Sequence, residues 1–434
     1  MPALGSEQKA TLLRYAAGTW SSLAALTDPG SGLPADKLYR DGTTDIETSI
    51  SNIGAYLWSV LVAARLGLLS RKEAISRLEA TLGSVADLER HRETGQFYNW
   101  YDHRTGVKIA GNPVISSVDN AWLATALHLV AQSVPEVAGK AAALFESMNF
   151  ACYYQSSLRQ IAVAYLPGDP TLMRHYDTIV SESRMATYLG IATGQLPREA
   201  YFGPRRVFPE DYERIRPEGK GKPLGFSQNH LGVEVFEGSY AYADMRIVPS
   251  FGGSMFEALM PALFVPEDRW GPKSWAINHP LTVRAQIYHG LVEVGYGYWG
   301  FSPCATPQGG YSAYGVAGIG MCDGYPSAGV VTPHASFLAL RWLPEAALAN
   351  LARLEHDFAM YDRRGFCDSV DVRTGCVAEV YLTLDQGIIM AAIGNALRRD
   401  MLRHAFATPA FRAILGPLIA LERFNVEPPA DQMR

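Results

Sequence analysis

Long apolar runs are missing from this 434-residue sequence, and no stretch approaches the roughly 20 residues that a membrane-spanning helix needs. The first ten residues also lack the basic segment followed by an apolar segment that marks a secretory signal peptide. We therefore expect a soluble, cytoplasmic protein with no membrane partner. A secreted protein whose signal peptide has been removed would show the same pattern.

An excess of charge of one sign is also lacking. The chain has 38 Lys and Arg residues against 43 Asp and Glu residues, and these are interspersed, so that the net charge is only −5. Without a basic stripe there is no surface to displace counterions from a phosphate backbone, which argues against nucleic acid as a partner. The hydrophobic fraction of 48% supplies enough apolar material for a large core and excludes intrinsic disorder.

Cysteines are few, and their number is odd. We expect free thiols in a reducing compartment, because none of the spacings is that of a short metal-binding motif. The histidines are isolated as well, and we expect His279, His289 and His334 to cap helices or donate hydrogen bonds rather than bind a metal. The five cysteines are Cys152, Cys304, Cys322, Cys367 and Cys376.

Common catalytic motifs are absent. The sequence contains no GxSxG, HExxH, CxxC or Walker motif. Serine hydrolases, zinc proteases and nucleotide triphosphatases therefore lack their local signals. We expect neither a metal nor a cofactor.

Helical periodicity dominates what the sequence does contain. Only Val233–Phe236 and Arg246–Val248 alternate in the manner of strands. About a dozen helices without a fixed-period repeat predict an all-α fold, an (α/α)6 toroid of six helical hairpins with long aromatic loops at one end. A helical solenoid or a pair of bundles would show similar periodicity. The helical segments are Leu12–Leu26, Ile50–Leu68, Lys72–Glu89, Asn120–Ala131, Val137–Met148, Thr178–Thr193, Met255–Leu263, Leu281–Val294, His334–Leu340, Pro344–Met360, Leu384–Ala396, Asp400–Phe406 and Pro409–Arg423.

We interpret residues 1–434 as one domain, because no proline-rich or low-complexity linker divides the chain. Phe202–Ile247 is predicted to be an insertion. Three loops carry an unusual density of aromatic residues: Phe97–Asp102, Tyr296–Ser302 and Gly309–Gly315. Aromatic rings with interleaved Asn, Ser and Asp suit stacking against sugar rings and hydrogen bonding to their hydroxyls, although single aromatics could equally plug the ends of a toroid.

Hydrolysis of a glycoside requires two carboxyl groups, one to protonate the leaving oxygen and one to activate water or attack carbon. Four carboxylates near loops and predicted helix starts are candidates: Asp119, Glu182, Glu257 and Asp385. The alternatives are structural. Asp119, Glu257 and Asp385 could cap helices, and Glu182, predicted to lie in an apolar helix, could pair with Arg184.

Ten short blocks, in order between about residues 45 and 397, give the chain a family resemblance. It resembles the glycoamylase-like domain shared by bacterial endo-β-1,2-glucanases (glycoside hydrolase family 144) and by the transglycosylating domain of cyclic β-1,2-glucan synthases. This resemblance implies an (α/α)6 toroid and activity on β-glucan. The blocks are Thr48–Gly54, Phe97–Asp102, Ser117–Asp119, Ser181–Arg184, Gly253–Glu257, Trp299–Ser302, Gly310–Tyr314, Val331–Ala335, Gly365–Phe366 and Leu384–Gly387.

The resemblance also implies roles for single residues. Glu182 matches the catalytic Glu of both branches, and Asp119 matches an active-site Asp of the glucanases. Their partners differ, because Trp122 and Pro303 stand where glucanases and synthases, respectively, have a second Glu. The loss of the synthase Glu argues against a retaining transglycosylase.

Our hypothesis is an inverting hydrolase of β-glucan, most typically β-1,2-glucan or its oligosaccharides, with Glu182 as general acid and Asp119 activating water. A transglycosylase, a phosphorylase, a hydrolase of another linkage and a non-catalytic glycan-binding protein remain alternatives, and the oligomeric state is open. The expected partner is an oligo- or polysaccharide substrate, and we expect neither nucleic acid nor a membrane as a partner. The residues predicted to bind substrate are Asn99, Trp100, Tyr101, Trp122, Arg184, Glu257, Trp299, Gln308, Tyr311 and Asp385.

Overall fold

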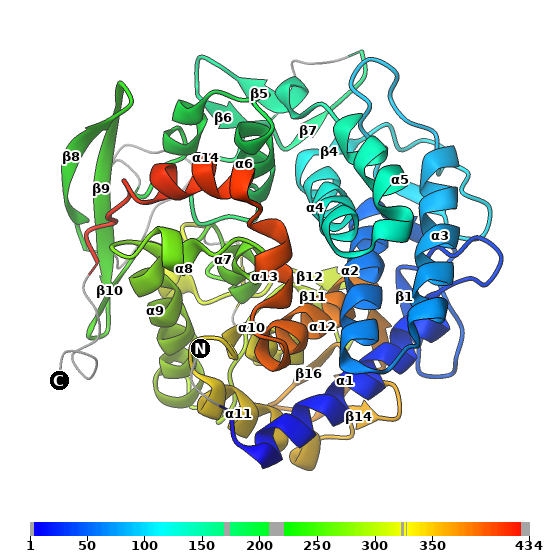
Figure 1. Cartoon of the computed structure of the whole chain (residues 1–434). Helices are drawn as coiled ribbons and strands as arrows, with labels where there is room; N and C mark the ends of the chain where they lie inside the picture. Colours follow the sequence, from blue (N-terminus) through cyan, green and yellow to red (C-terminus); the bar gives the residue numbers. More distant parts are fainter. Residues whose placement is uncertain (1–3, 169–173, 208–220, 323–324, 327, 427–434) are drawn as a thin grey trace.

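The computed structural model describes residues 4–168, 174–207, 221–322, 325–326 and 328–426. The chain is mostly helical, as predicted (Figure 1). The α-helices are α1 Ser6–Leu26, α2 Ile50–Leu66, α3 Arg71–Asp87, α4 Ser117–Ser133, α5 Pro135–Glu146, α6 Arg184–Ala192, α7 Met255–Leu259, α8 Glu267–Trp270, α9 Trp275–Tyr288, α10 Pro333–Ala339, α11 Pro344–Asp357, α12 Thr383–Leu397, α13 Met401–Phe406 and α14 Pro409–Ile419. None of the described helices is long and apolar enough to cross a membrane.

Six of the described helices form the interior. They contact one another in the order α7, α10, α12, α2, α4 and α6, and Arg184 of α6 reaches back to the carbonyls of Glu257 and Ala258 in α7. Helices α2 and α12 are apolar on all sides, which is the pattern of a fully buried helix. Helix α3 buries only one stripe, from Ala74 to Val85, and packs outside α2.

Short strands gather at the N-terminal ends of the interior helices. Strand β2 runs directly into α2, β4 into α4 and β18 into α12, and each pairs with a strand from a distant loop. This end of the helices is therefore covered by ordered loops. The short strands are β1 Lys37–Tyr39, β2 Glu47–Ser49, β3 Trp100–Asp102, β4 Ile115–Ser116, β5 Tyr154–Gln155, β6 Gln160–Ile161, β7 Ala164–Tyr165, β11 Cys304–Ala305, β12 Tyr311–Ser312, β13 Val330–Val331, β14 Tyr361–Asp362, β15 Gly365–Phe366, β16 Ser369–Asp371, β17 Cys376–Ala378 and β18 Val380–Leu382.

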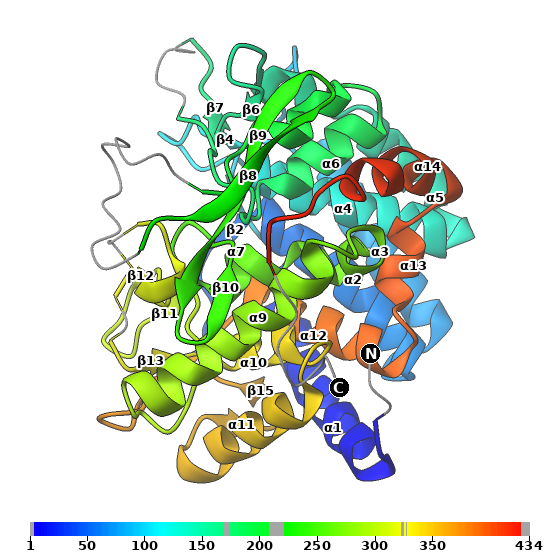
Figure 2. The same ribbon diagram turned by 90° about the vertical axis from the view of Figure 1, so that its left-hand side faces the viewer.

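The expectation of an all-α fold is too narrow. Strands β8 (Leu224–His230), β9 (Val233–Tyr242) and β10 (Met245–Ile247) form a three-stranded antiparallel sheet. The sheet lies on the outside of the helical body, within the predicted insertion (Figure 2). The sequence indicated parts of β9 and β10 but missed β8. The residues of β8 are mostly exposed and do not alternate between apolar and polar along the strand.

A second difference concerns the start of α6. The predicted helix at Thr178–Thr193 begins only at Arg184, because Thr178 and Val180 instead make parallel bridges to Arg205 and Ser250. The β-branched residues at 178–180 favour this extended backbone. Glu182 consequently lies in the turn before the helix and not within it. As predicted, the described residues contain no disulfide bond among the five cysteines.

Candidate active site

Glu182 lies at the edge of a pocket of about 510 Å³. The pocket is also lined by Glu257, Phe251, Tyr176 and Tyr325. Burial raises the pKa of Glu182 to about 8, while the hydrogen bond from Trp122 lowers it and the negative charges of Asp119 and Glu257 raise it. A carboxyl group with this pKa is protonated at neutral pH and can donate a proton.

Trp122 fixes the orientation of that carboxyl group. Its indole Nε1 donates to Oε2 of Glu182 over 2.9 Å, and the ring itself is buried against Trp58 and Phe264. An indole N–H can only donate, so Oε2 must accept. A carbonyl oxygen accepts better than a hydroxyl oxygen, and the proton of the acid form is therefore favoured on Oε1. Trp122 thus holds the acid in place and does not itself line the pocket.

Asp119 stands in the first turn of α4, close enough to Glu182 to raise its pKa. The helix is capped by Ser116, whose hydroxyl accepts the Asp119 N–H, so the carboxylate of Asp119 is not used as a cap. Its Oδ2 accepts a hydrogen bond from Nδ2 of Asn99 over 3.1 Å. Asp119 and Asn99 are both half-buried, and neither lines the pocket that Glu182 borders.

Glu257 lies in the first turn of α7, where Ser254 is the cap. Burial raises its pKa, and hydrogen bonds from the Gly252 N–H and from Ser250, Tyr325 and Ser254 oppose that rise. The Oε2 atom accepts from Gly252 over 2.9 Å. Glu257 is thus a second pocket carboxyl group, held by several donors.

Asp385, in the first turn of α12, belongs to a buried cluster with His334 and Asp368. One potential ligand atom from each residue lies within 4.8 Å of the others. Among the described residues, these three are the group that could surround a metal ion. Burial raises the pKa of both carboxyl groups, that of Asp385 to about 7, and lowers that of His334 to about 4. We interpret the two carboxyl groups as sharing a proton, because a hydrogen bond links them and like charges this close cannot both ionise readily.

Four predicted substrate-binding residues lie in the interior instead: Trp122, described above, and Arg184, Tyr101 and Trp299. Arg184 gives all five of its N–H groups to Glu267 and to the carbonyls of Ser181, Glu257 and Ala258, so none remains for a sugar. It supports the Glu182 turn from behind; the alternative in which it pairs with Glu182 and its predicted place in a subsite are both wrong.

The other two are loop aromatics. Tyr101 is fully buried and donates its hydroxyl to the Glu89 carbonyl, which fixes the first aromatic loop. Trp299 is 2% exposed, and its backbone is bound to Asn350. Both rings are core residues, in line with the alternative that single loop aromatics plug the ends of the toroid. Their predicted contacts with sugar are wrong.

The remaining predicted residues are accessible. Trp100 is half-buried in β3, and Gln308 is exposed in the turn between β11 and β12. Tyr311 is 61% exposed. Burial of the hydroxyl end of this side chain, with contributions from the charges of Asp385 and Glu182, raises its pKa.

Sequence reasoning missed Asp368, Tyr176 and Tyr325 as members of the site. Asp368 follows a cysteine in a short strand-rich segment and carries no local signal, since its partners come from α10 and α12. Tyr325 contacts Glu257 across about 70 residues of sequence, a proximity that only the fold creates.

Comparison with known proteins supports the family resemblance. The Glycoamylase family model, described as "Putative glucoamylase", matches residues 229–409. The cyclic β-(1,2)-glucan synthase NdvB of Rhizobium meliloti (strain 1021) is 27% identical over 92% of this chain. The chain spans only 18% of the length of that relative.

Solved structures share the fold. An endo-β-1,2-glucanase from Chitinophaga pinensis, in complex with sophorotriose and glucose, superposes with a TM-score of 0.71 and 18% identity over 96% of this chain and 98% of that one. A mutant endo-β-1,2-glucanase from Talaromyces funiculosus with bound β-1,2-glucan gives a TM-score of 0.70 and 13% identity over 97% and 91% of the two chains. At these identities the likeness establishes the fold alone.

Proposed function

We propose that this chain is a glycoside hydrolase that cleaves β-1,2-glucan or its oligosaccharides by an inverting mechanism. The observation that carries the proposal is Glu182, a pocket carboxyl group whose pKa is raised to about 8 and whose orientation is fixed by Trp122. The resemblance to a glucan synthase and to glucanases supports the choice of substrate.

In this mechanism the protonated Oε1 of Glu182 donates to the glycosidic oxygen as the bond to carbon breaks. Asp119, held by Asn99, accepts a proton from the attacking water, directly or through a second water. Glu257 keeps its acceptor oxygens beside the pocket and would bind sugar hydroxyls. Trp100, Gln308 and Tyr311 would line subsites, and Asp385 would bind substrate or support the loops.

The architecture that fits this function is a single (α/α)6 toroid over residues 1–434. The alternation of interior helices with the outer helices α1, α3, α5, α9 and α11 supports it, as does the gathering of strand-ended loops at one end. The carboxyl groups at 119, 257 and 385 all lie in the first turns of interior helices, beneath those loops.

Product analysis on a panel of β-1,2-, β-1,3-, β-1,4- and α-linked glucans tests the substrate. We expect short β-1,2-linked oligosaccharides and no products from the other linkages. Release from another linkage would contradict the assignment, and binding without products after prolonged incubation would indicate a glycan-binding protein.

The anomeric outcome tests the mechanism. Inversion predicts the α-anomer as the first product observed by NMR from a β-linked substrate. A β-anomer, or transfer to an added acceptor sugar, would indicate a retaining mechanism instead. Cleavage that depends on added phosphate would indicate a phosphorylase.

A further inference from the structure

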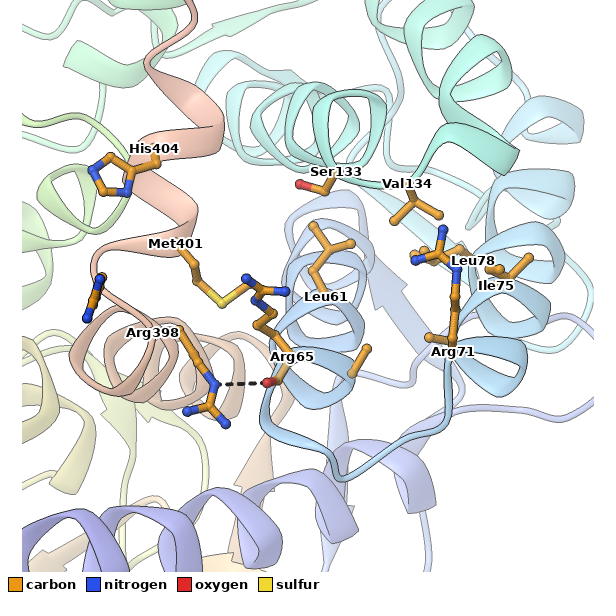
Figure 3. A pocket seen from close by; sticks show the side chains of 13 residues that line it. Leu61, Arg65, Arg71, Ile75, Leu78, Ser133, Val134, Arg398, Met401 and His404 are labelled. Atoms are coloured by element: carbon orange, nitrogen blue, oxygen red, sulfur yellow. Dashed lines mark hydrogen bonds between the residues drawn. The ribbon is translucent and has the colours of Figure 1, made fainter. Parts of the chain in front are cut away.

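A second cavity lies at the C-terminal ends of α2, α4 and α12 (Figure 3). It has a volume of about 620 Å³ and lies between α2, α3, the junction of α4 with α5, and α13. Helix α4 carries Asp119 in its first turn and contributes its last residue, Ser133, to this cavity. A helix of 17 residues is about 25 Å long, so the cavity is separate from the proposed glucan site.

The cavity combines an apolar wall with a basic rim. Leu61, Leu78, Val134 and Met401 form part of the wall (Figure 3). The rim carries four arginines and one histidine, and no Asp or Glu is among the lining residues that the structure describes. The rim residues are Arg65, Arg71, Arg398, Arg399 and His404.

Not all of this charge is available. Arg71 is paired with Glu136, and His404 contacts Arg269. Within the described residues, by contrast, the guanidinium groups of Arg65 and Arg399 make no ion pair.

Among the described residues, Arg398 donates only to two carbonyls, that of Arg65 (Figure 3) and that of Leu397. Three positive charges therefore stand at the cavity, where the C-terminal ends of α2, α4 and α12 and the N-terminal ends of α3, α5 and α13 offset one another. This positive charge complements the charge of about −1.5 to −2 on a phosphate monoester at neutral pH.

The turn that presents two of these arginines is strained. Arg399 and Asp400 have φ values of 50° and 60°, a left-handed conformation that residues other than glycine seldom adopt in succession. Buried Asp400 holds the turn through ion pairs with Arg269 and Arg341. Such strain persists where the surroundings enforce it, and it is concentrated at functional sites.

We propose that this cavity binds a phosphate ester that bears an apolar group. Arg65, Arg398 and Arg399 would hold the phosphate, and the wall at Leu61, Leu78 and Met401 would cover the apolar part. The ligand could be a soluble organic phosphate or the headgroup region of an anionic phospholipid, which share this chemistry. The site does not depend on the glucan activity of the chain.

Calorimetric titration of the full chain with hexyl phosphate tests the proposal. We expect saturable binding that is tighter than that of inorganic phosphate, and no binding of hexanol. The double variant Arg65→Gln/Arg399→Gln should weaken binding at least about tenfold, since each charge-assisted hydrogen bond is worth about that factor. Arg363→Gln, an exposed arginine outside the cavity, is the matched control and should bind normally.

Sedimentation with vesicles distinguishes the two sources of the ligand. Binding to phosphatidylglycerol but not to phosphatidylcholine vesicles, lost in the double variant, would identify the lipid. Binding of hexyl phosphate without sedimentation would identify a soluble ester. The proposal is overturned if hexyl phosphate does not bind, if it binds no more tightly than inorganic phosphate, or if the double variant binds it as the unmodified chain does.

Discussion

Replacing Trp122 by phenylalanine perturbs the group that orients the proposed acid. The variant keeps an aromatic ring but removes the donor that lies 2.9 Å from Oε2 of Glu182. A hydrogen bond to a charged acceptor contributes about 1.5–3 kcal/mol, and one between neutral groups about 0.5–1.5 kcal/mol. The lost bond therefore favoured the ionised carboxylate by about 1–1.5 kcal/mol, or about one pKa unit.

The expected result is an upward shift in the pKa of Glu182 from its value of about 8. Because the acid acts only when protonated, the alkaline limb of kcat/KM against pH should move up by about one unit. The assay is the pH–rate profile on a β-1,2-linked glucooligosaccharide for the unmodified chain and the variant.

Trp58→Phe is the matched control. Trp58 packs edge-on against Trp122 with ring centroids 6.5 Å apart, but its indole donates to the Gly387 carbonyl and not to Glu182. Both variants lose volume in the same buried cluster and should lose about 1–3 kcal/mol of stability. An alkaline limb that does not move in Trp122→Phe, or that moves equally in both variants, would refute the reasoning.

Three further predictions follow from the same contacts. Asp119→Asn should lower kcat by about 10²–10⁴-fold with little change in KM, measured by steady-state kinetics; a near-normal kcat would exclude Asp119 as the base. Glu182→Gln should remove a pH dependence of the free energy of unfolding. In the unmodified chain the folded-state pKa of Glu182 is raised to about 8, so the protein loses stability as pH rises from about 4.5 to 8. Urea unfolding between pH 5 and 8 should show a loss of up to about 3 kcal/mol in the unmodified chain that is absent from the variant. Arg184→Met should cost about 3–5 kcal/mol because it removes the arginine of a buried ion pair and leaves the Glu267 carboxylate with only Tyr188 and His279 as partners. A raised KM without loss of stability would instead place Arg184 in a subsite.

The helices were the most predictable part of the molecule, because the apolar residues of a half-buried helix recur at helical spacing within a short stretch of sequence. α2, α3 and α11 begin within one residue of their predicted starts. The start of α6 was predicted wrongly, since the pairing of Val180 with Ser250, far along the chain, overrides the local pattern. The same long-range pairing places Glu182 in a turn at the pocket.

The site was predictable only in part. The ordered family blocks made Glu182 and Asp119 the catalytic candidates, but they did not predict that the donor to Glu182 is Trp122 of α4. Arg184 appeared to be the partner of Glu182 because it is near in sequence, whereas its true partner, Glu267, is 83 residues away. Aromatic loop residues such as Trp299 cannot be assigned to core or surface before the fold is known.

The role of Glu182 as general acid is tested most directly by changing the leaving group. The measurement compares Glu182→Gln with the unmodified chain on β-1,2-glucan and on a 2,4-dinitrophenyl glycoside of a β-1,2-linked oligosaccharide. Dinitrophenolate leaves without protonation, so only the first substrate needs the acid. We predict that the variant loses nearly all activity on the glucan and retains most of it on the dinitrophenyl glycoside. Equal loss on both substrates, or near-normal cleavage of the glucan, would contradict this role.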